Sequence, residues 1–293
     1  MGSIVSTLAF PAPPAEYSKD VLLSRIHELK YLTTKNGLKI PALHIRKAGA
    51  RFTILYSHGN AEDVGICAMY LDRLAETCHA NVLAYEYPGY SISEGIASEP
   101  NCYEAIDAAY KYLTTEQPYQ NVDPSKIVVF GRSLGTGPSV DLCSRTKEVG
   151  GCVLQSPLES GIRCVMGDTA SFTLYPLDIF RSYQKVDKIE CPVFIMHGER
   201  DRVVPCSNGR ALYKTLCRRK CHVDYNPLWI ESAGHNDIPE PLVMNSVNKF
   251  LLFLQSQPRP LLIAQESIEE NNETERGVFS RLGDCCAPHG FKE

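Results

Sequence analysis

One segment decides the fold: Val128-Val129-Phe130-Gly131-Arg132-Ser133-Leu134-Gly135-Thr136-Gly137. It places the pattern Gly-x-Ser-x-Gly after a short apolar run typical of a buried strand and before a stretch with helical spacing. The glycines leave room for a sharp strand-to-helix turn, which would lift the hydroxyl of Ser133 above the edge of a sheet. The pattern Gly-x-Ser-x-Gly also occurs in ordinary turns, but the strand before it and the helix after it favour a nucleophile elbow.

Strand-like and helix-like stretches alternate on both sides of this segment. Such alternation predicts an α/β fold with a mostly parallel central sheet and helices on both faces. We expect an amino-terminal arm (1–16), one α/β domain (17–256) and a disordered acidic tail (257–293), in which residues 266–276 carry five glutamates. The predicted strands are residues 40–45, 52–56, 81–87, 127–130, 151–155, 193–196 and 228–231, and the predicted helices are 64–78, 101–113, 134–144, 209–217 and 242–254.

The composition excludes several classes of protein. The 293 residues carry 30 basic and 34 acidic side chains, a net charge of -4, which argues against a nucleic-acid binder. No apolar run approaches the ~18 residues that a membrane span needs. The first residues lack a basic region and a long apolar stretch, so we expect no secretory signal, a cytoplasmic location and free thiols among the 12 cysteines.

A nucleophilic serine needs a histidine base, and the base needs an acid that orients it. After a nucleophile elbow the order along the chain is serine, acid, histidine. The predicted strand 193–196 leads into a polar turn that contains Asp201, and a glycine-flanked loop after the strand 228–231 contains His235. We therefore expect a triad of Ser133, Asp201 and His235, with Asp237 as the weaker alternative acid.

An oxyanion hole needs two backbone N–H donors. The first is expected from Leu134, which follows the nucleophile, and the second from the loop after the strand 52–56. Asn60 is our choice on that loop, with Ala61 next. His58 precedes the serine in the chain, so we expect it to order the loop through a hydrogen bond rather than to act as the base.

Further motifs narrow the class of hydrolase. They are the segments 57–63 (SHGNAED), 87–91 (YPGYS), 156–161 (SPLESG) and 234–237 (GHND). Together with the elbow they resemble the α/β-hydrolase domain-containing protein 17 family, and the resemblance covers residues 20–255. It implies an α/β-hydrolase fold and a serine hydrolase that removes palmitoyl groups from cytoplasmic cysteines of membrane proteins. It assigns Ser133 as the nucleophile, Asp201 as the acid and His235 as the base, with no cofactor and no metal.

The amino terminus departs from that family, which carries a cysteine cluster there, whereas the first cysteine here is Cys67. Residues 1–6 (MGSIVS) instead fit the myristoylation pattern at Gly2. One myristoyl chain binds membranes only marginally, so a second signal is needed. Cys285 and Cys286 in the tail are candidates for acylation. We therefore expect a lipid-anchored protein on the cytoplasmic face of a membrane.

Two other segments bear on a lid and on metal binding. The connection between Leu158 and Pro192 is too short for a separate cap domain, and its apolar part, residues 172–180, would either pack on the sheet or wall an acyl groove. Cys217, Cys221 and His222 lack a second ligand pair at the spacing of a zinc finger, so no metal is expected.

The expected partners are S-palmitoylated protein substrates and a membrane surface, with no nucleic acid. Two alternatives remain open at this point. One is an esterase for lipids or small esters on the same fold, and the other is a non-catalytic α/β-hydrolase binding module.

Overall fold

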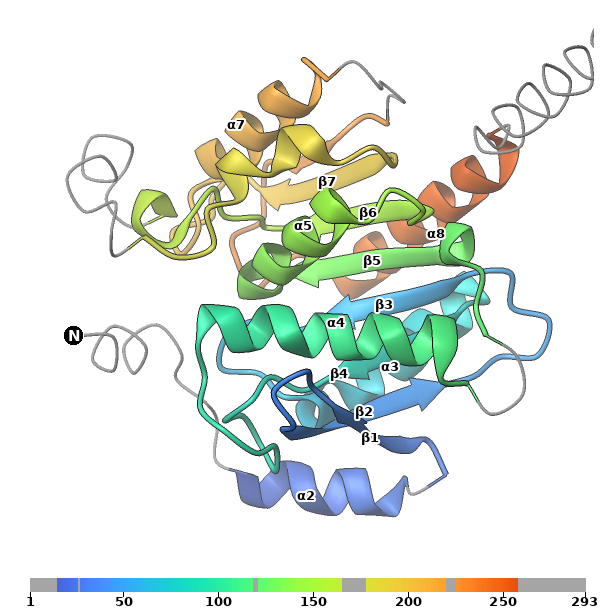
Figure 1. Ribbon diagram of the computed structural model, residues 1–293. Helices are drawn as coiled ribbons and strands as arrows, with labels where there is room; N and C mark the ends of the chain where they lie inside the picture. Colours follow the sequence, from blue (N-terminus) through green and yellow to red (C-terminus); the bar gives the residue numbers. More distant parts are fainter. Residues whose placement is uncertain (1–14, 26, 118–120, 165–177, 220–224, 258–293) are drawn as a thin grey trace, which may run out of the picture. The chain divides into compact units, whose positions relative to one another are not determined.

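The computed structural model describes residues 15–25, 27–117, 121–164, 178–219 and 225–257. Contacts divide the chain into two units, Met1–Leu254 and Gln255–Glu293, and the account below concerns the first. Its centre is an eight-stranded sheet with the order β1-β2-β4-β3-β5-β6-β7-β8 (Figure 1). β1 and β2 are antiparallel to each other and β2 is antiparallel to β4, whereas all other neighbours are parallel. The turn at Ser133 follows β5, which lies in the parallel part of the sheet.

The strands are short and mostly buried. In chain order they are β1 (Leu29–Thr33), β2 (Lys39–Ile45), β3 (Thr53–Ser57), β4 (Asn81–Tyr85), β5 (Ile127–Arg132), β6 (Gly151–Gln155), β7 (Val193–Gly198) and β8 (Leu228–Ile230). Every residue of β3, β6 and β7 is buried. Strands of a parallel sheet are covered on both faces, which explains why these read as continuous apolar runs.

Helices cover both faces of the sheet (Figure 1). One apolar cluster joins a face of the sheet to α3 and α8, with Leu22 of α2 included, and the other joins the opposite face to α4, α5 and α7. The helices are α2 (Ala15–Ser24), α3 (Val64–Cys78), α4 (Glu99–Thr115), α5 (Thr136–Arg145), α7 (Cys206–Leu216) and α8 (Glu240–Ser256), and 3-10 turns lie at Pro124–Lys126, Ser133–Gly135, Ser182–Gln184 and Val186–Lys188. The predicted α/β architecture with a mostly parallel sheet is confirmed.

The structure corrects several predicted boundaries. α2 and β1 were not predicted: β1 pairs only with β2, and Tyr31 on it is 57% exposed, so its pattern is weak. The strand predicted over 81–87 ends at Tyr85. The helix predicted from residue 134 begins as a 3-10 turn over Ser133–Gly135, and α5 proper starts at Thr136.

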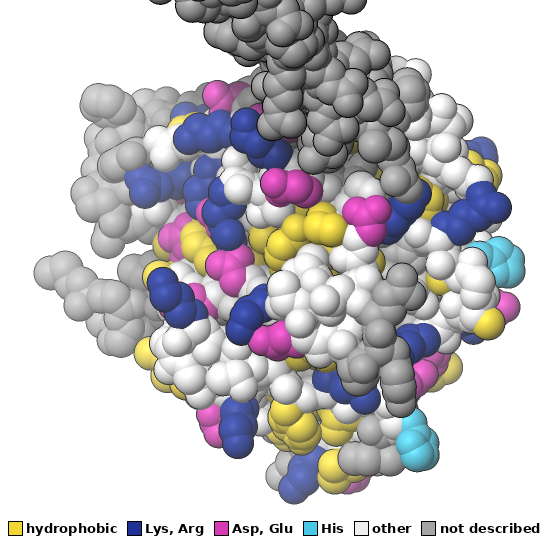
Figure 2. Space-filling model, turned by 45° about the vertical axis from the view of Figure 1, so that its right-hand side comes forward, with side chains coloured by type: hydrophobic (Ala, Val, Ile, Leu, Met, Phe, Trp, Pro, Cys, Tyr) yellow, Lys and Arg dark blue, Asp and Glu magenta, His cyan; other side chains and the backbone are white. Residues whose placement is uncertain are grey.

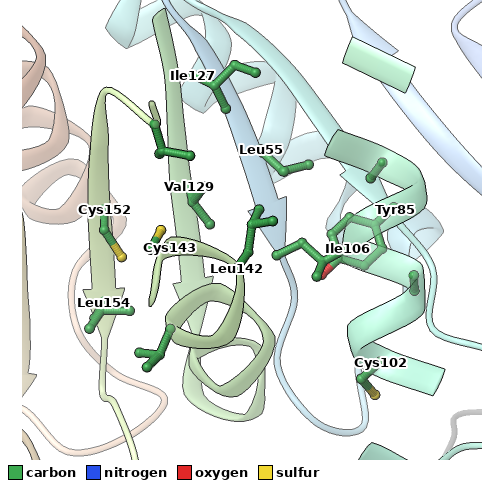
Figure 3. Packing of buried hydrophobic residues seen from close by; sticks show 14 of the residues in the cluster. Leu55, Tyr85, Cys102, Ile106, Ile127, Val129, Leu142, Cys143, Cys152 and Leu154 are labelled. Carbon is green, nitrogen blue, oxygen red and sulfur yellow. The ribbon is translucent and has the colours of Figure 1, made fainter. Parts of the chain in front are cut away.

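Most of the described cysteines are part of the apolar core. All nine cysteines in the described segments are free, and seven of them are buried. Cys143 and Cys152 pack among Val129, Leu142 and Leu154, and Cys102 lies on α4 in another part of the same apolar cluster (Figure 3). There they fill space as small apolar groups.

The surface mixes charges of both signs. On the face shown in Figure 2, basic and acidic side chains are interspersed with small apolar patches. Among the described helices, none is both long and apolar enough to cross a bilayer.

Candidate active site

Ser133 lies where β5 turns into the α5 segment, and its φ is 51°. Left-handed backbone is unfavourable for a residue with a side chain, so the surroundings must hold it in place. Two glycines allow this close turn. A Cβ on Gly135 would lie 2.2 Å from the carbonyl oxygen of Ser57, and one on Gly131 would lie 2.5 Å from that of Gly135. The elbow therefore packs tightly against the end of β3.

Three side chains that are far apart in the sequence form a hydrogen-bonded chain. The Nε2 of His235 lies 2.9 Å from Oγ of Ser133, and the Nδ1 of His235 lies 2.7 Å from Oδ2 of Asp201. Because a carboxylate only accepts, Nδ1 carries the proton and Nε2 is left to accept from the serine hydroxyl. The residues follow β5, β7 and β8, whose carboxyl ends lie at one edge of the sheet. The structure brings together the three residues that the sequence predicted as a triad.

Asp201 is buried and accepts hydrogen bonds at both oxygens. Its Oδ1 accepts from the backbone N–H groups of Val203 and Val204, each at 2.8 Å. Burial raises the pKa of this carboxyl, but hydrogen bonds from His197, His235 and the Val204 backbone outweigh burial and lower the pKa well below its usual range. Asp201 is therefore ionised at neutral pH.

His197 at the end of β7 is a second neighbour of Asp201 that the sequence analysis did not single out. Its side chain is fully buried, and its Nε2 lies 3.3 Å from Oδ2 of Asp201 and 2.8 Å from the carbonyl oxygen of Val204. Both partners are acceptors, so Nε2 carries the proton. A Cβ on Gly209 would lie 2.6 Å from Nδ1 of His197, so that glycine leaves room for the ring. Only the position of His197, four residues before Asp201, could have signalled this contact.

The alternative acid, Asp237, has a different partner. Its Oδ1 accepts from the backbone N–H of Gly234 at 2.5 Å and closes the loop that carries His235. Asp237 therefore has a structural role within the segment 234–237.

The predicted oxyanion loop follows β3 and lies beside the elbow, since Ser57 pairs with Gly131 in the sheet. The Oδ1 of Asn60 accepts from the hydroxyl of Tyr90 at 2.7 Å, and the N–H of Gly59 donates to Oε2 of Glu62 at 2.8 Å. These contacts fix the loop. The roles of the Asn60 and Leu134 amides as oxyanion donors stay predictions.

His58 orders this loop, as expected. Its Nδ1 lies 2.9 Å from the carbonyl oxygen of Gly59 and its Nε2 lies 2.8 Å from Oε1 of Glu86. Glu86 is fully buried and also accepts from the backbone N–H groups of Val64 and Tyr87. The buried glutamate therefore joins the start of α3 to the loop after β3, and the sequence analysis did not identify it.

Arg132, the last residue of β5 and directly before the nucleophile, contacts two loops. Its guanidinium forms an ion pair with Glu62 of the predicted oxyanion loop, and its Nη2 donates to Oδ1 of Asn236 at 3.0 Å. Asn236 follows His235. One side chain thus links the segments that carry Asn60, Ser133 and His235. We call Glu62, Arg132 and Asn236 the arginine bridge.

All three residues of this bridge line an open pocket of about 260 Å³ between α3, α8 and the ends of β3, β5 and β6. His235 forms part of its wall. The lining residues are Tyr56, Glu62, Ile66, Cys67, Tyr70, Arg132, Gln155, His235, Asn236, Ile238, Glu240 and Val243.

Some predicted residues lie outside the described segments: Gly2, Cys221, His222, Cys285, Cys286 and residues 165–177 of the connection between Leu158 and Pro192. Within the part of the chain that the structure describes, no group of three or more His, Cys, Asp or Glu side chains could hold a metal ion.

The chain is similar in sequence to several alpha/beta hydrolase domain-containing proteins. Alpha/beta hydrolase domain-containing protein 17C of Homo sapiens is 39% identical over 213 residues, which cover 72% of this chain and 61% of that protein. Protein 17B of Xenopus tropicalis is 39% identical over 206 residues (70% of this chain, 68% of that protein). Alpha/beta hydrolase domain-containing protein aho-3 of Caenorhabditis elegans is 35% identical over 255 residues (80% and 74%). The chain spans less than two thirds of the length of the 17C relative. A family described as Chlamydia CHLPS protein (DUF818) matches residues 24–149.

Solved structures agree on the fold. An esterase of Pyrococcus furiosus, Pf2001, superposes with a TM-score of 0.61 at 22% identity, covering 82% of this chain and 98% of that one. Alpha/beta hydrolase domain-containing protein 10 from mouse gives a TM-score of 0.57 at 13% identity, covering 77% and 99%. At these identities the likeness establishes the α/β-hydrolase fold alone.

Proposed function

Because this chain belongs to the alpha/beta hydrolase domain-containing protein 17 family, we propose that it is a serine hydrolase that removes palmitoyl groups from S-acylated cysteines of membrane-associated proteins. One observation carries the proposal. The hydrogen-bonded chain from Ser133 through His235 to Asp201 has the spacing and the proton placement that nucleophilic catalysis by serine requires.

The chemistry follows from this chain. His235 Nε2 takes the proton of the Ser133 hydroxyl while Oγ attacks the thioester carbonyl, and Asp201 stabilises the imidazolium that forms. The amides of Leu134 and Asn60 bind the oxyanion. Collapse breaks the carbon–sulfur bond, and His235 gives its proton to the leaving cysteine sulfur. Water then attacks the acyl-serine with His235 as base, which releases the fatty acid and restores the serine.

The surface around the site supports a substrate at a membrane. Four large apolar side chains are exposed on segments that follow strands at their carboxyl ends, the edge that carries Ser133. Ile66 follows β3, Ile96 follows β4, Val203 follows β7 and Leu242 follows β8, with exposed fractions between 36% and 74%. Apolar groups around a site favour contact with lipid or with an acylated protein. Lipidation at Gly2, Cys285 and Cys286 would supply the anchor to the cytoplasmic face of a membrane.

Two substrates test the proposal. The full chain is incubated with a palmitoylated peptide thioester and, separately, with a monoacylglycerol, and a fluorophosphonate probe reports the nucleophile. We expect thiol release and probe labelling by the wild type, loss of both in Ser133→Ala, and no loss in Ser144→Ala, a serine on α5 that contacts a backbone carbonyl.

The other outcomes separate the alternatives. Serine-dependent labelling without thiol release, but with turnover of the monoacylglycerol, would replace the thioesterase by a lipid esterase on the same site. A folded wild type that reacts with no probe and no ester would leave a binding module. Labelling that survives in Ser133→Ala would assign the nucleophile to another serine.

A further inference from the structure

Side chains hold the backbone of the loop that follows β3. The hydroxyl of Tyr87 donates to the carbonyl oxygen of His58 at 2.8 Å. The N–H of Gly59 donates to Oε2 of Glu62 at 2.8 Å, and the carbonyl oxygen of Gly59 accepts from Nδ1 of His58 at 2.9 Å. These contacts fix the planes of both peptide units that meet at Gly59.

The carbonyl oxygen of Gly59 and the N–H of Asn60 belong to one peptide unit. The described chain contains no cis peptide bond, and in a trans unit the C=O and N–H bonds point in opposite directions. Because His58 fixes the direction of the carbonyl, it fixes the direction of the Asn60 N–H as well. That N–H therefore points away from the His58 ring. Asn60 is the residue predicted to donate to the oxyanion.

The partners of the His58 ring determine which nitrogen carries a proton. A carbonyl oxygen only accepts, so Nδ1 is protonated and donates to Gly59. Nε2 lies 2.8 Å from Oε1 of Glu86, and the two carboxyl oxygens of Glu86 also accept from the backbone N–H groups of Tyr87 and Val64. A nitrogen and a carboxyl oxygen at this distance share a proton, because two bare acceptors would repel each other. Glu86 therefore holds the ring by Nε2 and leaves the Nδ1 proton for Gly59.

Burial keeps the ring in this orientation. His58 and Glu86 are both fully buried. The ring of His58 also packs against Tyr87 and Tyr90, with centroid distances of 4.2 and 5.8 Å. A rotation that moved Nδ1 from the carbonyl would break the hydrogen bond to Glu86 and disrupt this packing. The direction of the Asn60 N–H is therefore set before a substrate binds, as stabilisation of a developing charge requires.

We propose that His58, held by Glu86, aims the N–H of Asn60 at the oxyanion. This rests on the proposed function and on the predicted role of Asn60 in it. His58 touches no reacting atom, so it is a positioning residue of the oxyanion hole, whereas His235 is the base. The donor it aims acts on charge that develops in the transition state, so His58 should affect kcat and leave KM unchanged.

Two substitutions isolate the hydrogen bond to Gly59. In His58→Asn the side-chain amide nitrogen takes the place of Nδ1 and can still donate, whereas His58→Leu is of similar size and has no donor. Both variants lose the contact with Glu86, so a difference between them reports the donor alone. His27→Leu, at an exposed position, is the control for the substitution itself.

The substrates are a soluble activated ester and the thionoester with sulfur in place of its carbonyl oxygen. Sulfur is a weak acceptor, so the oxyanion donors contribute little to hydrolysis of the thionoester. We expect His58→Leu to lower kcat on the ester about 100- to 1,000-fold with KM unchanged, and to change kcat on the thionoester far less. His58→Asn should regain about tenfold or more of the lost rate on the ester. His27→Leu should behave as the wild type on both substrates.

Equal losses on the two substrates would overturn the inference, because displacement of Ser133 or His235 slows both reactions alike. So would a His58→Asn variant no faster than His58→Leu on the ester. If the single variants do not fold, each is combined with Glu86→Gln, which removes the buried charge left without its ring partner, and the same comparison is made.

Failure of the proposed function has a separate signature. A wild type that hydrolyses the activated ester but not a palmitoylated peptide thioester would correct the substrate and leave the role of His58 to the ester measurements. A wild type that hydrolyses none of the three substrates would overturn the proposed function, and this inference with it.

Discussion

His197 and His235 direct a ring nitrogen at the same atom: Nε2 of His197 lies 3.3 Å and Nδ1 of His235 lies 2.7 Å from Oδ2 of Asp201. The carboxylate is therefore held by a buried ring as well as by the base. His197 touches no reacting atom, so it acts by positioning Asp201.

Replacing His197 by Gln should loosen that carboxylate. We expect kcat to fall about tenfold with KM unchanged, because misplacement of a catalytic group by a fraction of an ångström costs rate rather than binding. Steady-state kinetics on a soluble ester measures both constants. His27→Gln, at an exposed position, is the control, and a rise in KM alone would contradict the positioning role.

The arginine bridge should act as a unit. Glu62→Gln and Arg132→Gln are each expected to lower kcat about tenfold, and the double variant should lose little more than either single one, since each single change already breaks the ion pair. A double-mutant cycle on kcat/KM measures the coupling. Strictly additive losses would show that the two side chains act separately.

Close packing at the elbow predicts a stability effect. Gly135→Ala would place a methyl group 2.2 Å from the carbonyl oxygen of Ser57, so backbone must shift. We expect the free energy of unfolding to fall by about 3 kcal/mol, together with activity. Urea unfolding measures the first quantity, and Ser144→Ala should leave it within error. Wild-type stability in Gly135→Ala would mean that the elbow can relax.

The buried His44 on β2 should make the stability of the fold depend on pH. Burial first, and then the charges of Arg46 and Lys30, lower the pKa of His44 to about 4. The unfolded chain binds this proton near pH 6.5 and the folded chain near pH 4, so stability is full above pH 6.5 and falls as pH drops towards 4.

Removing the titrating group should remove that part of the pH dependence. His44→Gln is expected to flatten the fall in unfolding free energy between pH 6.5 and pH 4, a difference of up to about 3 kcal/mol at the lower pH. Urea unfolding at several pH values checks it. Parallel curves for the variant and the wild type would show that His44 does not titrate in this range.

Sequence reasoning succeeds here where a pattern is local. The helix expected over 64–78 is α3, Val64–Cys78, because its apolar spacing and the Asp63 cap lie within one segment. It also predicts that Ser133, Asp201 and His235 meet at one edge of the sheet, since a strand followed by a polar turn has a defined place there, and hydrogen bonds join the three side chains. The order of those turns along the chain then limits their roles.

Sequence reasoning fails where a feature depends on contacts between segments that are far apart in the chain. The contact of His197 with Asp201 depends on how β7 bends into the following turn. The arginine bridge needs Arg132 at the end of β5 to meet Glu62 and Asn236 from two loops, and the pocket has walls from α3, α8 and three strands. The hydrophobic pattern within one segment does not predict contacts between residues from different segments.

The arginine bridge also bears on how the site opens. Loops that are separate in the chain ordinarily unfold locally and independently, each with its own rate of amide hydrogen exchange. Because one guanidinium contacts both loops from the end of β5, the loops carrying Gly59 and His235 and the turn carrying Ser133 should instead open as one cooperative unit. The protected amides of these three segments should exchange with one common free energy of opening. Replacing Arg132 should give each segment its own free energy of opening.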